Sequence, residues 1–139
     1  MIRNTATVIL AVLFGQPALA ASCEHFNMSG LWELKSARYE DQTGKVLAEV
    51  KDGSLLSRKW LVDGKVSFVT WHPDGKFEVA ASGLYEFKDG LYLENIEVSS
   101  LPRLVGKNYR FNCQISDGVW LHSGQEDHLF IFEYWQRSH

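Results

Sequence analysis

Residues 81–98, with the sequence ASGLYEFKDGLYLENIEV, decide the fold of this chain. Apolar and polar side chains alternate on both sides of Asp89-Gly90, which is typical of half-buried β-strands. An Asp-Gly dipeptide suits the type I′ turn of a two-residue hairpin, because both central residues need a positive φ angle. The predicted cross-strand pairs are Lys88 with Leu91, Phe87 with Tyr92, Tyr85 with Glu94, and Gly83 with Ile96.

The two faces of this hairpin differ in polarity. One face carries a single carboxylate, Glu94, opposite the phenol of Tyr85, and we predict that this face points inward. Its members are Ala81, Gly83, Tyr85, Phe87, Tyr92, Glu94, Ile96 and Val98.

A second hairpin is predicted at Asp117-Gly118 by the same turn chemistry. It pairs Ile115 with Trp120 and Cys113 with His122. Its predicted inner face comprises Tyr109, Phe111, Cys113, Ile115, Trp120 and His122.

The facing of two other regions stays open. In the hairpin around Asp63-Gly64 both faces are partly apolar, so the alternation does not orient residues 56–71. The same holds for residues 129–136, where both faces carry large apolar side chains.

The rest of the chain repeats the pattern of short strands and turns. Further turn dipeptides are Thr43-Gly44, Asp52-Gly53 and Asp74-Gly75, and no segment after residue 20 has a sustained helical pattern. An antiparallel meander of this length can form a sandwich or close into a barrel, and closure removes exposed strand edges. We therefore predict an all-β fold, a single antiparallel up-and-down β-barrel of about 8–10 strands, whose interior is wide enough for side chains or one small ligand. The predicted strands are 30–39, 45–51, 56–62, 65–71, 76–87, 91–98, 107–116, 119–123 and 129–136.

Composition narrows the class of protein. The chain has 139 residues, is 45% hydrophobic and carries a formal net charge of -3, which indicates one globular domain. The absence of a basic excess argues against a nucleic-acid partner. The 5 Trp, 5 Tyr and 8 Phe exclude a disordered chain.

Residues 1–20 resemble a secretory signal peptide. Arg3 precedes an apolar run from Thr5 to Gly15, and Ala18-Leu19-Ala20 fits a cleavage site. The run is too short to span a bilayer, and no later segment qualifies as a transmembrane segment. We expect export to the periplasm or the medium, with a tail at 21–28 and the barrel domain at 29–137.

Export to an oxidising compartment makes Cys23 and Cys113 candidates for a disulfide. A second interpretation of Cys23 is a lipid anchor, because Ala20-Ala21-Ser22-Cys23 loosely resembles a bacterial lipoprotein box. Two free thiols are the third alternative.

Several motifs resemble those of small secreted bacterial lipocalin-like domains of the calycin type, a group of uncharacterised function. Gly30-Leu31-Trp32 matches their G-x-W opening, and the resemblance extends over residues 29–137. It implies an antiparallel barrel with a pocket, a base closed by Trp32, and Arg137 packed over that Trp. The other matching stretches are Glu33–Ala37, Pro73–Phe77, Gly83–Tyr85, Tyr92–Glu94, Leu104–Lys107, Phe111–Cys113, Trp120–Gly124 and Glu133–Arg137.

Glu94 and His122 are the candidate chemical groups. A carboxylate on an inward apolar face is costly unless it is hydrogen-bonded or neutralised, and Tyr85 is placed to donate to it. Glu94 is therefore a satisfied core residue, a polar anchor in a ligand pocket, or an acid–base group acting with His122. Cys113 beside His122 also permits a thiolate–imidazole pair, provided that Cys113 is not in a disulfide.

Parity with Trp32 suggests further inward groups. If Arg137 packs on Trp32, alternation places Glu133 and Trp135 inside the barrel. Arg38 shares the parity of Trp32 and is a candidate second buried cation, and these charges serve either ligand recognition or only the neutralisation of Glu94. The His residues are scattered without metal-ligand spacing, and no nucleotide or hydrolase motif occurs, so we predict no metal and no cofactor.

Three functions remain as hypotheses. The first is an exported barrel that binds a small apolar or amphipathic molecule. The second is a barrel enzyme (cyclase, lyase, isomerase or decarboxylase), and the third is a filled barrel acting as an envelope accessory protein. The sequence favours binding over catalysis and leaves the oligomeric state open. The predicted ligand-binding residues are Tyr85, Tyr92, Glu94, Tyr109, Phe111, Trp120 and His122.

Overall fold

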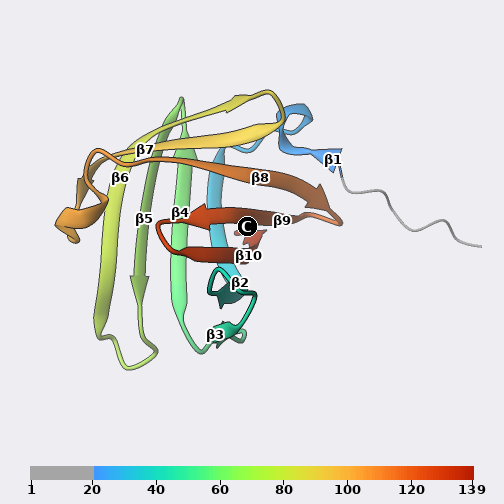
Figure 1. Cartoon of the computed structure of the whole chain (residues 1–139). Coiled ribbons are helices and arrows are strands. Elements are labelled where there is room, and N and C mark those ends of the chain that lie inside the picture. The colour runs from blue at the N-terminus through green and yellow to red at the C-terminus, as the bar shows by residue number, and fades with distance from the viewer. Residues whose placement is uncertain (1–20) are drawn as a thin grey trace, which may run out of the picture.

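A computed structural model of the chain describes residues 21–139, and the predicted signal peptide at 1–20 lies outside the described residues. Eight strands form a closed antiparallel up-and-down barrel in the order β2-β4-β5-β6-β7-β8-β9-β10, with β10 paired back to β2 (Figure 1). The predicted fold class is confirmed, and the architecture is compatible with a lipocalin-like fold. The elements are β1 (Ala21–Ser22), η1 (Cys23–His25), β2 (Gly30–Glu40), β3 (Val46–Val50), β4 (Leu56–Val62), β5 (Lys65–Trp71), β6 (Phe77–Lys88), β7 (Leu91–Ser99), η2 (Pro102–Leu104), β8 (Asn108–Ser116), β9 (Val119–Glu126) and β10 (Leu129–Arg137).

Two short strands add to the barrel. β1 pairs with β8, and β3 pairs with the far end of β2. No helix within residues 21–139 has the length and apolar character needed to cross a membrane.

The Asp-Gly turns form the predicted hairpins. Asp89 and Gly90 both adopt positive φ angles, of 53° and 76°, as a type I′ turn requires. The register also agrees with the sequence prediction, because Tyr85 pairs with Glu94 and Cys113 pairs with His122.

A register shift at Gly83 changes the inner face of β7. The pairing moves from Gly83 with Ile96 to Ser82 with Val98, so Val98 turns outward and is 66% exposed. The prediction of an inward Val98 is therefore wrong. Only glycine fits at position 83, since a Cβ atom there would lie 1.8 Å from the carbonyl oxygen of Asn95.

A second shift, in β2, overturns the prediction for Arg38. Leu34 pairs with Trp135 and Ser36 with Tyr134, so Lys35 is an extra residue that reverses the alternation. Arg38 consequently lies outside, where its side chain is 46% exposed and pairs with Glu40 at 2.8 Å.

β4 and β5 bury three polar side chains, those of Ser57, Lys59 and Thr70, on the inner face. Ser57, Lys59 and Leu61 of β4 are buried, whereas Trp60 between them is exposed. On β5, Val66 and Thr70 are buried beside them. This orientation places Lys59 inside the barrel.

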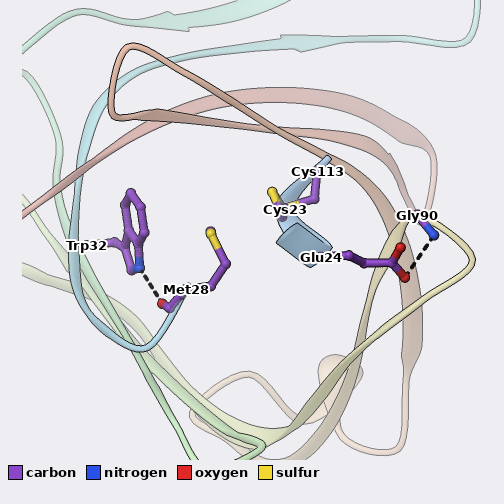
Figure 2. The surroundings of a disulfide bond; sticks show 6 residues. All are labelled: Cys23, Glu24, Met28, Trp32, Gly90 and Cys113. Atoms are coloured by element: carbon purple, nitrogen blue, oxygen red, sulfur yellow. Dashed lines mark hydrogen bonds between the residues drawn. A yellow bond between two sulfur atoms is a disulfide. The ribbon is translucent and has the colours of Figure 1, made fainter. Parts of the chain in front are cut away.

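The N-terminal tail closes one end of the barrel, which we call the base (Figure 2). A disulfide joins Cys23 of η1 to Cys113 of β8, and the backbone N–H of Gly90 donates to the Glu24 carboxylate at 3.1 Å. A sulfur in a disulfide cannot also carry a thioether-linked lipid, so this geometry contradicts both the lipid-anchor interpretation of Cys23 and the free-thiol interpretation.

Trp32 is the central side chain of the base. Its indole N–H donates to the carbonyl of Met28 at 2.9 Å (Figure 2). The guanidinium of Arg137 lies 4.6 Å from the Trp32 ring centroid and donates to the carbonyls of Asn27 and Ser29. The tail, the first strand and the last strand are therefore fastened together at one point.

Candidate functional site

The other end of the barrel, which we call the mouth, contains a cavity of about 530 Å³. This volume falls in the range of small-molecule sites, roughly 300–1,000 Å³. Its wall combines apolar side chains with a few ionisable groups. The lining residues are Tyr39, Leu47, Ala48, Leu55, Ser57, Lys59, Phe68, Thr70, Glu78, Val79, Glu94, Leu101, Arg103, Leu104, Phe111, His122, Glu126, Leu129, Ile131, Glu133 and Trp135.

Lys59 lies at the floor of this cavity, inside a group of aromatic rings. Its ammonium nitrogen is 4.9–5.8 Å from the ring centroids of four residues, and a cation in this position is attracted to the negative faces of the rings. The ammonium also pairs with Glu94 at 3.8 Å, and both side chains are only 6% exposed. The four rings belong to Phe68, Tyr92, Trp120 and Trp135.

The hydrogen-bond donor to Glu94 differs from the predicted one. The Tyr92 hydroxyl donates to Glu94 Oε2 at 2.6 Å, whereas Tyr85 stacks on the ring of Tyr92 with the centroids 5.8 Å apart. Tyr92 and Glu94 are two residues apart on the same face of β7, which brings the hydroxyl within reach. Burial raises the pKa of Tyr92 well above its usual value, and the Glu94 charge adds to this shift. Tyr92 therefore remains a donor.

Glu133 is a second internal carboxylate. It accepts a hydrogen bond from the Tyr39 hydroxyl at 3.3 Å and another from the Trp135 indole N–H at 3.0 Å. Burial raises the pKa of Glu133, and the Lys59 charge opposes part of that rise. The Tyr39 pKa is also raised, first by burial and then by the Glu133 charge.

Glu126 is a third carboxylate of the cavity, at the end of β9 near the mouth. Burial raises its pKa to about 7, and repulsion from Glu133 and Glu94 adds to the rise. Within residues 21–139 no hydrogen bond to this carboxylate is found. Glu126 therefore changes its charge near neutral pH.

His122 is 2% exposed and lies between aromatic rings, with its centroid 4.0 Å from that of Phe111. Burial, and then the positive charge of Lys59, lower the pKa of His122 well below its usual value. The imidazole is therefore neutral. Its Nδ1 is buried and has no hydrogen-bond partner among residues 21–139.

The structure does not bring all the predicted ligand-binding residues to one volume. Glu94, Phe111 and His122 line the cavity, and Tyr92 and Trp120 lie beneath it around Lys59. Tyr85 and Tyr109 instead border a second hollow of about 650 Å³ formed by β6, β7 and β8, and Glu94 is the one predicted residue that lines both volumes. The predicted convergence on one interior volume is therefore corrected: Tyr85 packs against Tyr92 and Phe87 and becomes part of the wall.

Sequence analysis missed Lys59, Glu126 and Tyr39 as site residues. Lys59 was hidden because Trp60 and Val62 make the outer face of β4 as apolar as the inner one. Glu126 has a usable signal, because it follows His122 and Gly124 at a spacing of two along β9. Tyr39 enters the interior only through the register shift in β2, which the alternation does not reveal.

One further predicted chemistry depends on the sulfur of Cys113. Cys113 is in the disulfide, so a thiolate–imidazole pair with His122 is excluded. Among residues 21–139 no group of three His, Cys, Asp or Glu side chains lies close enough together to hold a metal ion.

Comparison with known proteins adds no family assignment. No protein-family model matches the chain, and no curated protein and no solved structure gives a significant match.

Proposed function

We propose that this protein is an exported barrel that binds a small amphipathic molecule in the cavity at its mouth. The cavity itself is the observation that carries this proposal. A volume of about 530 Å³ is far larger than a packing defect, and native cores leave few voids larger than a water molecule. It therefore favours binding over a filled barrel that works through its outer surface.

The distribution of polar groups supports an amphipathic rather than a purely apolar ligand. Leu101, Leu129 and Ile131 supply apolar wall, while Lys59, Glu94 and Glu133 lie at the inner end. Binding sites of this kind typically combine an apolar lining with a few placed polar groups that fix ligand orientation. Catalysis by Glu94 and His122 stays a prediction.

Export is part of the proposal, and the disulfide supports it. Cys23–Cys113 is a single long-range bridge, and such bonds persist in oxidising compartments outside the cytosol. The sequence pattern of residues 1–20 points the same way.

The proposal is tested by binding of the neutral fluorescent probe N-phenyl-1-naphthylamine to the purified oxidised protein. Two substitutions on β6 form a matched pair. Val79→Trp fills the mouth cavity, and Leu84→Trp adds the same side chain at the hollow on the outside of the barrel. We expect the probe to bind wild type and Leu84→Trp alike and to lose most of its affinity for Val79→Trp.

The reverse pattern, with binding lost only in Leu84→Trp, would move the site to the outer hollow. Equal binding to all three proteins would overturn the proposal. Circular dichroism of both variants is the control for folding.

A further inference from the structure

The cavity carries more negative than positive groups. Among the described residues that line it, Lys59 faces three inward carboxylates, those of Glu94, Glu126 and Glu133. The remaining two charged lining residues lie at the rim and have partners outside the cavity. Arg103 pairs with Asp127 at 2.9 Å, and Glu78 contacts His72 at 2.7 Å.

The positive charge of Lys59 is already compensated. Its ammonium pairs with Glu94 and lies over aromatic rings, so these two residues form a neutral unit at the floor. The charge of Lys59 offsets part of the pKa rise of Glu133 and Glu126, and Arg103 does the same for Glu126, but neither cation forms an ion pair with these two carboxylates among the described residues. Their mutual repulsion is one of the causes that raise the pKa of Glu126, so an added positive charge would relieve it.

His122 is a second, independent indication that a polar group of a ligand belongs here. The side chain lines the cavity, is almost fully buried, and has an unpartnered Nδ1. Buried polar atoms are normally hydrogen-bonded, and a neutral imidazole offers one donor and one acceptor. His122 also lies directly opposite Glu133 in the β9–β10 register, so both side chains point to the same region.

A protonated amine matches these groups better than an alcohol or a carboxylate. Its N–H groups can donate to Glu126, to Glu133 and to an imidazole nitrogen, and its charge balances the excess of carboxylates. A ligand carboxylate would meet like charges in a poorly solvated site and would be repelled. The apolar wall accepts the rest of the molecule.

Resting on the proposed function, we propose that the ligand is a cationic amphiphile, an alkyl or aryl amine whose ammonium group binds between Glu126 and Glu133 beside His122. The aromatic cluster beneath does not compete for this group, because Lys59 already occupies it.

The test compares three probes of equal chain length: dodecylamine, dodecanol and dodecanoate. The affinity of each amphiphile is measured by its displacement of N-phenyl-1-naphthylamine at pH 8, with the amphiphile kept below its critical micelle concentration. We expect dodecylamine to bind at least about tenfold more tightly than the other two, the ratio that one favourable charge interaction of moderate strength supplies. Glu126→Gln should reduce this preference several-fold while naphthylamine binding persists.

Glu97→Gln is the matched control, because Glu97 is an exposed glutamate on β7 and its loss changes the net charge equally. Glu97→Gln should keep the preference for the amine. Val79→Trp, whose cavity is filled, should bind none of the three amphiphiles. Because Val79→Trp is expected to bind little probe, amphiphile binding to this variant is measured directly by isothermal titration calorimetry. A preference for the amine that survives there would show adsorption to the acidic surface and would overturn the inference.

The amine assignment and binding in the cavity give different results when they are wrong. If dodecanol or dodecanoate binds as tightly as dodecylamine, the amine assignment is wrong and binding in the cavity stands. If neither the naphthylamine nor any of the three amphiphiles binds, both proposals are wrong.

Discussion

The two ends of the barrel use their polar groups in opposite ways. At the base, Trp32 and Arg137 donate hydrogen bonds to the backbone of the tail and stack on each other, and a disulfide fixes the tail to β8, although the buried hydroxyl of Ser22 has no hydrogen-bond partner among the described residues. At the mouth, burial raises the pKa of Glu126, and the buried Nδ1 of His122 has no hydrogen-bond partner among the described residues. Within residues 21–139 the strand β3 at the mouth pairs with β2 alone, and Leu47 on it is 53% exposed.

This difference indicates which end contributes stability and which end contributes function. The disulfide and the contacts of Trp32 and Arg137 add to the free energy of unfolding. At the mouth, burial shifts the pKa values of Glu126 and His122 away from their ordinary values, which lowers stability, and ionisable groups with shifted pKa values commonly mark binding or catalytic sites. Substitutions at the two ends should therefore separate stability from binding.

The largest effect on stability is expected from removal of the disulfide. Cys23 and Cys113 are 90 residues apart, so the disulfide restricts a long loop of the unfolded chain. Cys23→Ser/Cys113→Ser should lower the free energy of unfolding by about 4 kcal/mol, because the unfolded state regains that conformational entropy. Urea unfolding of oxidised wild type and the variant measures this difference. An unchanged midpoint would contradict the role given to the base, and probe affinity of the folded variant should remain within about twofold.

The next largest effect is expected at the floor of the cavity. Lys59→Met should destabilise by about 3 kcal/mol, because it leaves the Glu94 carboxylate buried without its cation. Adding Glu94→Gln to the variant should restore part of that loss. A double-mutant cycle measured by urea unfolding tests the coupling, and strictly additive effects would show that the two side chains do not form a pair.

A smaller loss is expected from Arg137→Lys at the base. A lysine keeps the charge but cannot reproduce both the stack on Trp32 and the two hydrogen bonds to Asn27 and Ser29, so we expect a loss of about 1 kcal/mol. Arg110→Lys, at an exposed position of β8, is the control and should have no measurable effect.

The smallest effect is expected at the mouth, and it depends on pH. The folded pKa of Glu126, about 7, lies above the ordinary value of 4.5, so the folded state binds a proton that the unfolded state lacks between these values. The contribution of Glu126 to the free energy of unfolding of wild type is therefore present below pH 4.5 and is lost as the pH rises to about 7. Glu126→Gln should be more stable than wild type by about 1 kcal/mol at pH 8, and the difference should shrink toward pH 5.

This pH effect is measured as a difference between the two proteins, because neighbouring charges act on Glu126. Glu133, Glu94, Lys59 and Arg103 face Glu126 from β10, β7, β4 and η2. His122 has the opposite pH dependence. Its pKa is lowered in the folded state, so its contribution to stability is lost as the pH falls below the ordinary histidine pKa of 6.5. A difference that grows toward pH 5 would contradict the assigned shift of Glu126.

The sequence predicts the barrel well because its turns are explicit. Asp-Gly dipeptides at Asp63, Asp89 and Asp117 set two-residue hairpins, and these set the register of six strands. Inward positions near the turns, such as Glu94 and His122, follow from simple alternation.

The sequence predicts the site less well because alternation fails where the strands shift register. The extra residue at Lys35 turns Arg38 outward, and the shift beside Gly83 does the same to Val98. Lys59 is missed for another reason: an internal ion pair is stabilised by Glu94 on a strand far along the chain, and no local pattern reports such a partner.

The most direct test of the account is isotope-filtered nuclear Overhauser spectroscopy of the protein with bound dodecylamine. We predict contacts from the alkyl chain to the methyl groups of Val79, Leu129 and Ile131 inside the mouth cavity. Contacts confined to Leu84 and Leu93 of the outer hollow would contradict the central claim that this barrel holds its ligand within.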